Sequence, residues 1–305
     1  MWILGSTLSI SQRSLLPEIP PSPLQQRAQE LAHQLIQSYA SRPAISAAVD
    51  FIKGISPAAE ITNGQLLRVA APSGLLDGLG LPVGYGVKGG AAREALSAAL
   101  GIRAPRPPRD IDVVRWGTHR IAEDESVARR LMPRDFQHGA RVEVIRDLEG
   151  YISTRDLTIN EVVATDGTVA ASVTCALDSI GQVLRPSRYR GGTLHRKPGL
   201  FGQSILKMVR LYAEGSCAGE SWTIAGIPEE ASFSDFDLAV HLNKAFQRGK
   251  PVAERFLHAC SLLSLLAACD DPVQATLRDL EHLRHGERSL LPDVPAEEWH
   301  RALQG

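Results

Sequence analysis

Apolar residues recur every three or four positions near the start of the chain, and this spacing is typical of helices. Between Leu24 and Tyr39 they fall along one helical face, and Ser22-Pro23 before them is a typical helix start. A second helix is predicted for about residues 43–53. We therefore expect a helical N-terminal extension over residues 1–80. It either packs against the rest of the protein, or it serves as an oligomer contact or a partner-binding cap.

Further along, the pattern changes to short strands separated by helices. Residues 56–82 are rich in glycine, proline and alanine and are predicted to be a connector, with one short strand at 66–70. The strands that follow are predicted at 83–88, 110–114 and 140–145, with a hairpin at 159–169, and the helices at 91–100 and 119–131. From residue 233 onward the pattern is helical. The predicted fold class is α+β, with a small mixed sheet flanked by helices in a domain at 81–182 and a helical neck and body domain at 183–305.

Composition adds few constraints to this picture. The 305 residues are 44% hydrophobic and 22% charged, which is typical of a globular protein with a sizeable core. The net charge of −1 means that any contact with nucleic acid must use a local basic patch. The four cysteines have no CxxC spacing, and we see neither a signal peptide nor an apolar run of membrane-spanning length. We expect a cytoplasmic protein with no membrane partner.

The first candidate for chemistry is the double glycine between the strand at 83–88 and the helix at 91–100. Gly89 and Gly90 let backbone N–H groups approach a phosphate, and the helix N-terminus favours its negative charge. Arg93 lies in the first turn of that helix, where a cation is unusual unless an anion is near. A double glycine alone is more often an ordinary turn.

The second candidate is a set of three carboxylates. Asp110 and Asp112 are two residues apart, so in a strand they point to the same face, and Glu143 lies in a later predicted strand. Adjacent carboxylates are the usual ligands of Mg²⁺ together with substrate phosphates. A lone Asp-x-Asp is more often a solvated strand end, but its combination with the glycine turn favours two-metal nucleotidyl transfer.

A basic stretch at residues 185–197 is the third candidate. Such a run, with Tyr189 available for stacking, suits an RNA backbone or a triphosphate, and the alternative is a solvated loop. The residues predicted to bind RNA are Arg185, Arg188, Arg190, Arg196 and Lys197.

The order of these motifs resembles that of a known family. Gly-Gly-x-x-Arg, Asp-x-Asp, His138-Gly139, a glutamate and then residues 155–160 (Arg-Asp-Leu-Thr-Ile-Asn) resemble the class II tRNA nucleotidyltransferase (CCA-adding) and bacterial poly(A) polymerase family. The likeness covers about residues 83–215. It implies a polymerase-beta-like nucleotidyltransferase palm that uses Mg²⁺ and an NTP (ATP or CTP, or both). It also implies transfer of NMP to an RNA 3′ end, in particular that of a tRNA.

The resemblance also implies roles for individual residues. Asp110 and Asp112 would hold the metal, with Glu143 completing the catalytic set. Gly89, Gly90 and Arg93 would bind the triphosphate. The predicted sugar- and base-side contacts are Arg155, Asp156 and Asn160.

The chain also departs from the family pattern. Thr154 replaces an arginine, and the segment at 144–154 is short where the family has a long one. Gln203, Ser204 and Lys207 stand where the family has its Glu-Asp-x-x-Arg template, while Arg210 matches. Gln203, Lys207 and Arg210 are accordingly predicted to bind nucleotide in a divergent member of the family. Such a member would add one type of nucleotide or modify tRNA as a toxin or defence effector.

Two other functions stay open at this point. One is a non-catalytic RNA-binding or regulatory protein that retains the palm. The other is a nucleotidyltransferase that acts on a protein or a small molecule.

Overall fold

The computed structural model describes residues 12–15, 17, 19–37, 41–106, 110–118, 120–133, 137, 141–165, 167–187, 198–228, 233–266, 271, 273–276 and 278. Contacts divide these residues into two compact units. The sheet unit contains the described residues of Pro21–Val183 together with Ser187, and the helical unit contains those up to Pro20, Leu184–Pro186 and those after Gly192. The three-part division expected from the sequence stays a prediction about domains.

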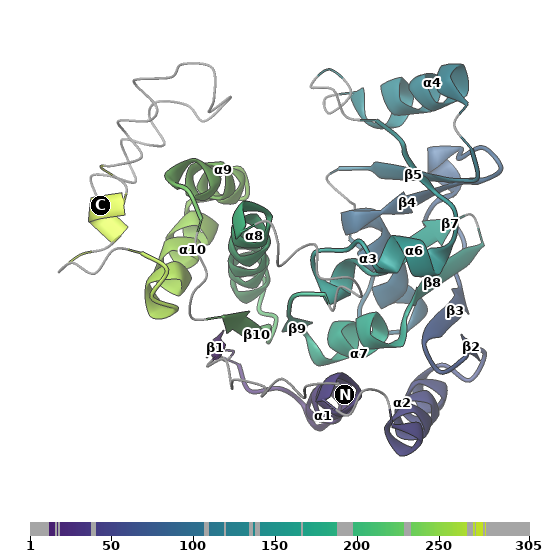
Figure 1. Cartoon of the computed structure of the whole chain (residues 1–305), viewed down its shortest axis with the longest axis horizontal. Helices are drawn as coiled ribbons and strands as arrows, with labels where there is room; N and C mark the ends of the chain where they lie inside the picture. The colour runs from purple at the N-terminus through teal and green to yellow at the C-terminus, as the bar shows by residue number, and fades with distance from the viewer. Residues whose placement is uncertain are drawn as a thin grey trace, which may run out of the picture. The chain divides into compact units, whose positions relative to one another are not determined.

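The sheet unit is built on a seven-stranded mixed sheet (Figure 1). The strands in spatial order are β2 (Glu60–Thr62), β3 (Leu66–Ala70), β8 (Thr168–Ser172), β7 (Val162–Thr165), β4 (Tyr85–Lys88), β5 (Asp112–Trp116) and β6 (Glu143–Ile145). Neighbours are antiparallel except β5 and β6, which are parallel. The predicted α+β class with a mixed sheet is confirmed, and the sheet is larger than expected.

Two strands of this sheet come from the segment predicted to be a connector. The predicted strand at 66–70 is confirmed as β3, which pairs with β8 along its whole length. Leu67 and Val69 are buried and Arg68 between them is exposed, the alternation of a strand with one buried face. β2 extends the sheet beyond β3 through a turn in which Asn63 and Gly64 both have positive φ. β3 is held in the sheet by its pairing with β8, which lies about a hundred residues further along the chain. Composition alone therefore did not show that this segment forms two strands.

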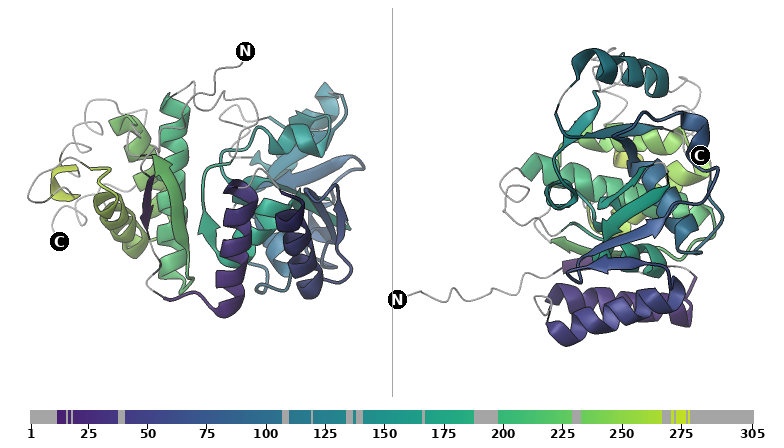
Figure 2. Two further views of the ribbon diagram at one scale, coloured as in Figure 1. Left: turned by 60° about the horizontal axis from the view of Figure 1, so that its bottom comes forward. Right: turned by 90° about the vertical axis from the view of Figure 1, so that its right-hand side faces the viewer.

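Four helices of the sheet unit lie close to predicted positions, and two further helices, Leu148–Ile152 and Val173–Gly181, were not predicted. In chain order the helices are α1 (Pro23–Gln37), α2 (Arg42–Ile55), α3 (Gly89–Ala99), α4 (Ile121–Leu131), α6 (Leu148–Ile152) and α7 (Val173–Gly181), with short 3-10 turns η1 (Asp77–Leu79) and η2 (Thr158–Asn160). α1 and α2 lie side by side (Figure 2), and both contact α7. The Gln29 side chain donates to the carbonyl of Gly181 at 2.8 Å. The packing interpretation of the N-terminal helices is therefore confirmed.

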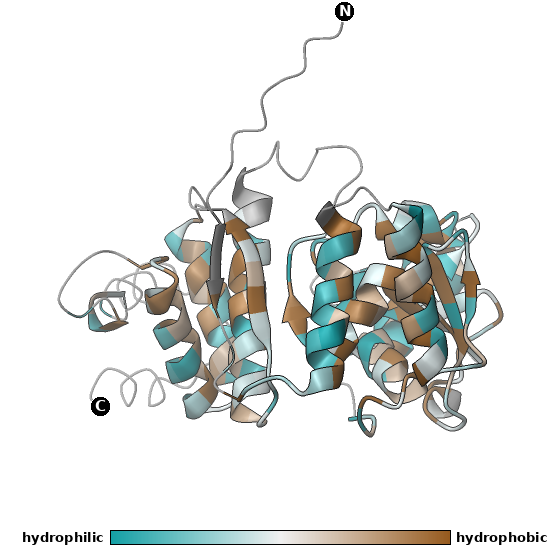
Figure 3. Cartoon of the chain, turned by 90° about the horizontal axis from the view of Figure 1, so that it is seen from below, coloured by the Kyte–Doolittle hydropathy of each residue, from teal (hydrophilic) through white to brown (hydrophobic). Residues whose placement is uncertain are grey.

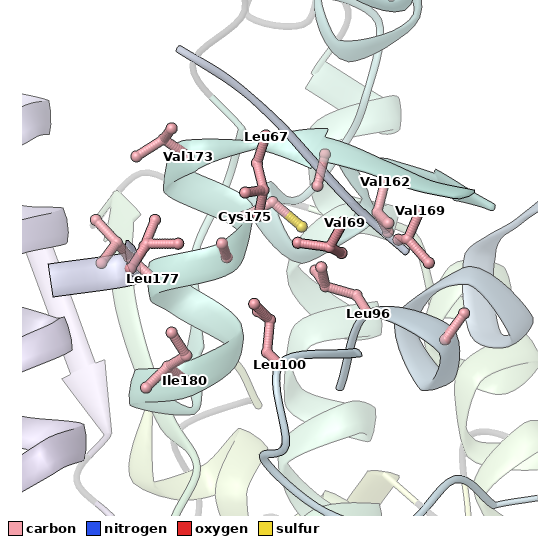
Figure 4. Close-up of a cluster of buried hydrophobic side chains, with 14 of the residues drawn as sticks. Leu67, Val69, Leu96, Leu100, Val162, Val169, Val173, Cys175, Leu177 and Ile180 are labelled. Carbon is pink, nitrogen blue, oxygen red and sulfur yellow. The ribbon is translucent and has the colours of Figure 1, made fainter. Parts of the chain in front are cut away.

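The main core of the sheet unit lies between these helices and the strands (Figure 4). Leu67 from β3, Leu96 from α3, Val162 from β7 and Leu177 from α7 are all fully buried in it. Each such side chain contributes roughly 1.5–3 kcal/mol when it leaves water. This core joins elements from residues 28 to 180, so the N-terminal helices and the strands around the glycine turn form one packed body.

Glu161 and Asp178 are two of the buried carboxyl groups in this unit. Glu161 accepts hydrogen bonds from the hydroxyls of Ser172 and Ser187, and Asp178 accepts one from Thr158 at 2.6 Å. Burial raises the pKa of Glu161 to about 7, opposed by the two serine hydrogen bonds and supported by the charge of Asp178. The network links β8 and α7 to the η2 turn, which carries Asn160.

The helical unit contains three long helices and a small sheet. The helices are α8 (Pro198–Cys217), α9 (Asp235–Phe246) and α10 (Lys250–Leu262), and the strand order is β1 (Gln12–Leu15), β10 (Thr223–Pro228), β9 (Val183–Leu184). Helices of the protein carry both apolar and polar positions (Figure 3), as amphipathic packing requires. None of the helices in the described ranges has the length and apolar character of a membrane span.

Replacing the buried Glu161 is expected to change how stability depends on pH. A carboxyl group with a raised folded-state pKa contributes stability that is fully present below the ordinary value of 4.5 and is lost as pH rises through about 7. Urea unfolding of the wild type should therefore show a fall on the order of 3 kcal/mol from this group between pH 4.5 and 8. Glu161→Gln should lack that fall.

Glu60→Gln is the matched control, because Glu60 is exposed on β2. It should reproduce the wild-type pH dependence. The same fall in Glu161→Gln as in the wild type would contradict a proton held by Glu161 in the folded state.

Candidate functional site

The site is organised by the turn that joins β4 to α3. Gly89 has a φ of +61°, which favours glycine, and a Cβ at this position would lie 2.7 Å from Oδ2 of Asp112. Gly90 next to it has no such restriction, since its Cβ would lie 3.9 Å from the nearest atom, in the Arg93 guanidinium. The turn therefore places the start of α3 directly against the Asp112 carboxylate.

Asp112 is the first residue of β5 and pairs with Lys88, the last residue of β4. The expectation that Asp110 and Asp112 both stand in a strand is wrong for Asp110, which is exposed in a bend before β5. The reason is that β4 turns into α3 at Gly89, so it offers no ladder partner beyond Lys88. Asp110 has polar interactions of its own in this position.

Glu143 lies on the same face of the sheet as Asp112. It pairs with Val114 in β5, two residues after Asp112, and side chains two apart share a face. Its carboxylate accepts a hydrogen bond from Lys88 and one from Arg155 at 2.6 Å. Burial opposes ionisation of Glu143, but the contacts with Lys88 and Arg155 outweigh it and lower the pKa of this carboxyl. Glu143 is thus an ionised carboxylate held between two cations.

Arg155 is fixed in place by several contacts besides Glu143. Its guanidinium stacks over the Tyr151 ring at 4.0 Å from the centroid. Its Nε donates to the Tyr151 carbonyl at 3.1 Å, and its Nη2 donates to the Thr154 hydroxyl at 2.7 Å. Thr154, the residue that departs from the family pattern, therefore helps to orient the arginine that follows it.

Arg93, Asn160 and Asp156 form a second chain of contacts. Arg93 donates to Oδ1 of Asn160 at 2.5 Å, and Nδ2 of Asn160 donates to Oδ1 of Asp156 at 2.6 Å. The Tyr151 hydroxyl reaches the carbonyl of Asn160 at 3.4 Å, which connects this chain to Arg155. Of the predicted site residues in the sheet unit, the structure thus joins Glu143, Arg155, Asn160, Asp156 and Arg93 in one polar network.

The carboxylates around the turn are arranged as follows with respect to a metal ion. Within the described part of the chain, no group of three or more His, Cys, Asp and Glu side chains is arranged to hold a metal ion. Glu143 is already neutralised by Lys88 and Arg155. Asp110 and Asp112 stay the carboxylates predicted to hold Mg²⁺, an ion that can take one or two protein carboxylates and complete its shell with nucleotide phosphates and water.

Four of the remaining predicted site residues belong to the helical unit. Gln203, Lys207 and Arg210 lie on α8, where Gln203 donates to Asp237 of α9 at 2.8 Å and Arg210 donates to Glu214. Arg185 lies just after β9 and is half-buried. The other residues predicted to bind RNA, Arg188, Arg190, Arg196 and Lys197, lie outside the described residues, as does His138-Gly139.

Sequence reasoning missed two members of the network, Lys88 and Tyr151. A signal for Lys88 existed, because it ends the strand before the double glycine and faces the aspartate strand in any antiparallel pairing of the two. Tyr151 carries no such signal, since its role depends on where Arg155 folds back over the short helix α6.

Comparison with solved structures finds a likeness to a CCA-adding enzyme. The chain is similar to the crystal structure of the Bacillus stearothermophilus CCA-adding enzyme in complex with CTP, with 17% sequence identity and a TM-score of 0.42. The match covers 76% of this chain and 64% of that one, so this chain spans less than two thirds of its length. This degree of likeness concerns the fold and supports no activity or substrate. No protein-family model and no curated protein matches the chain.

The neighbouring glycines allow a matched test of the turn. Gly89→Ala should lower the free energy of unfolding by about 1–3 kcal/mol, because alanine is strained at this φ and its Cβ meets the Asp112 carboxylate. Gly90→Ala should change it by less than about 1 kcal/mol, because alanine is a better helix former than glycine. Urea unfolding measures both values. Equal effects of the two substitutions would show that the turn is not built on Gly89.

Proposed function

We propose that this protein is a Mg²⁺-dependent nucleotidyltransferase that moves NMP from an NTP to the 3′ hydroxyl of an RNA, with tRNA as the expected acceptor. The supporting observation is the packing of Gly89 against the Asp112 carboxylate. It puts a helix N-terminus, which favours phosphate, beside a carboxylate suited to a cation. A nucleoside triphosphate with its magnesium ion combines both kinds of ligand.

In this proposal the backbone N–H groups at Gly89 and Gly90 bind the triphosphate. Arg93 adds positive charge from α3, held in place through Asn160. Asp110 and Asp112 would hold Mg²⁺, which supplies charge stabilisation for the leaving pyrophosphate when it is bound. Asp156 and Asn160, joined by their hydrogen bond, are assigned to the sugar and base side of the nucleotide.

The reaction itself is a balanced displacement at phosphorus. The acceptor hydroxyl oxygen forms a bond to the α-phosphorus, the bond between the α-phosphorus and the bridging oxygen breaks, and pyrophosphate leaves. The hydroxyl proton passes to Glu143 or to water. Phosphates of the nucleotide compete with Glu143 for Lys88 and Arg155, so nucleotide binding would release this carboxylate for the acceptor.

On the helical unit, Gln203, Lys207 and Arg210 are proposed to contact the nucleotide, and the basic stretch from Arg185 to contact RNA. Gln203 and Ser204 stand in place of the two acidic residues of the resembling family's template, and Lys207 keeps the positive charge of its arginine. We infer a divergent enzyme, which uses one type of nucleotide or acts on tRNA as a toxin or defence effector.

A second candidate function is a nucleotide- or RNA-binding protein without catalysis. The observation that favours it is the pairing of Glu143 with two cations, which withdraws the third carboxylate from a metal site. The two candidates share nucleotide binding and differ in group transfer.

Asp112→Asn separates these candidates. Pure protein is incubated with tRNA trimmed of its 3′ end, Mg²⁺ and each α-labelled NTP in turn. Wild-type protein should label the RNA, and Asp112→Asn should lower the rate at least about a hundredfold, because it removes charge from the metal position. Asp50→Asn, a change at an exposed residue of α2, should keep the wild-type rate.

Three other outcomes are informative. Label that enters a protein or a small molecule, and still depends on Asp112, would replace RNA as the acceptor. Binding of Mg²⁺ and NTP in calorimetry without any transfer would support the non-catalytic candidate. An absence of NTP binding would overturn the enzyme and leave an RNA-binding protein without catalysis as the candidate.

A further inference from the structure

Lys88 reaches across the middle one of three neighbouring strands. It ends β4 and pairs directly with Asp112 of β5, so the two side chains lie on the same face of the sheet. β5 lies next to β4 (Figure 1) and separates it from β6, which carries Glu143. Because the Lys88 ammonium nevertheless contacts the Glu143 carboxylate, its side chain passes over β5 beside Asp112.

Both carboxylate oxygens of Glu143 already accept hydrogen bonds from cations. Oε1 accepts from Nη2 of Arg155 at 2.6 Å. Oε2 accepts from Lys88 and, at 3.4 Å, from Nη1 of Arg155. The side chains of Lys88 and Glu143 are half-buried, so water and salt screen this charge pairing only in part. A metal ion that bound Glu143 would have to displace one of these two cations and would be repelled by both.

Asp112 differs from Glu143 in its contacts. Within the described ranges its carboxylate forms no ion pair, and one of its oxygens faces the turn at Gly89. Lys88 and Arg155 carry two positive charges, which equal in number the negative charges of Asp112 and Glu143. Asp110 is left out of this count because it has polar interactions of its own. The negative charge that a metal ion would compensate at Glu143 is thus compensated by the protein itself.

We propose that the Lys88 ammonium replaces a second metal ion, so that the site uses a single Mg²⁺, bound on the Asp112 side. This inference rests on the proposed function, because it concerns the cations of that reaction. In a two-metal site, the ions stabilise the attacking and the leaving oxygens. A lysine ammonium supplies a compact positive charge, and Lys88 is held by the ion pair that it already makes. The Asp-x-Asp motif favoured two metal ions, and the position of Lys88 opposes that expectation.

The test measures how the full chain binds Mn²⁺, which prefers the same oxygen ligands as Mg²⁺. Electron paramagnetic resonance of the free ion gives the affinity. Lys88→Met should bind Mn²⁺ at least about tenfold more tightly than the wild type, because it removes a repelling charge and frees Oε2 of Glu143. Lys88→Arg keeps the charge and should show no gain. Lys53→Met, at an exposed residue of α2, should show none either.

A double-mutant comparison shows whether the gain comes through Glu143. Glu143→Gln should weaken Mn²⁺ binding at least about tenfold more in the Lys88→Met background than in the wild type, because only there is Glu143 a ligand. The competing interpretation is an ion pair that only holds β4 and β6 in place. It predicts no such coupling between the two substitutions.

A second variant covers the case in which circular dichroism shows that Lys88→Met does not fold. Lys88→Gln also removes the charge, and its side chain can still hydrogen-bond to Glu143. A gain in Mn²⁺ affinity that depends on Glu143 supports the proposal. No gain, or a gain that is as large when Glu143 is replaced, overturns it.

The failure of this inference can be told apart from failure of the transfer reaction. A wild-type protein that labels RNA, in variants of which Lys88 and Glu143 show no coupling, would keep the enzyme and refute the role of Lys88. Coupling without any transfer of NMP would retain Lys88 in the position of a metal ion and refute the enzyme.

Discussion

The β4–α3 turn is the constraint on which the rest of the site depends. Gly89 adopts a positive φ within contact distance of the Asp112 carboxylate, so the strand ladder ends at the pair of Lys88 and Asp112. Any side chain at Gly89 would disturb both the turn and the carboxylate. One backbone conformation thereby sets the start of α3, the first residue of β5 and the position of Asp110 outside the strand.

Around that turn, the polar residues hold one another in a preformed arrangement. Glu143 is partly removed from water, which would raise its free energy as a carboxylate, and Lys88 and Arg155 compensate. Arg155 is held in turn by Tyr151, which also reaches the carbonyl of Asn160. Cations fixed in this way lose little side-chain entropy when an anion binds. In the proposed function that anion is a phosphate of the nucleotide.

Local pattern was enough to predict most elements and the candidate motifs. The serine and proline at the start of α1, the alternation in β3 and the double glycine at the start of α3 each act within a few residues, so their signal is present in the chain itself. Pairings over long distance were not predictable in this way. The joining of β3 to β8, the contact of Lys88 with Glu143 and the matching of α8 with α9 all depend on how distant segments pack.

By itself, the sequence determined which residues can do chemistry: a glycine turn able to approach phosphate, carboxylates two residues apart, and the arginines near them. Tertiary structure decided how those residues are used. It left Asp110 before the strand and neutralised Glu143 with two cations. It also placed His241 near three positively charged side chains, which help to lower the pKa of its imidazole. The physical reason is that propensity and spacing act over a few residues. Charge pairing and burial depend on segments that the fold alone brings together.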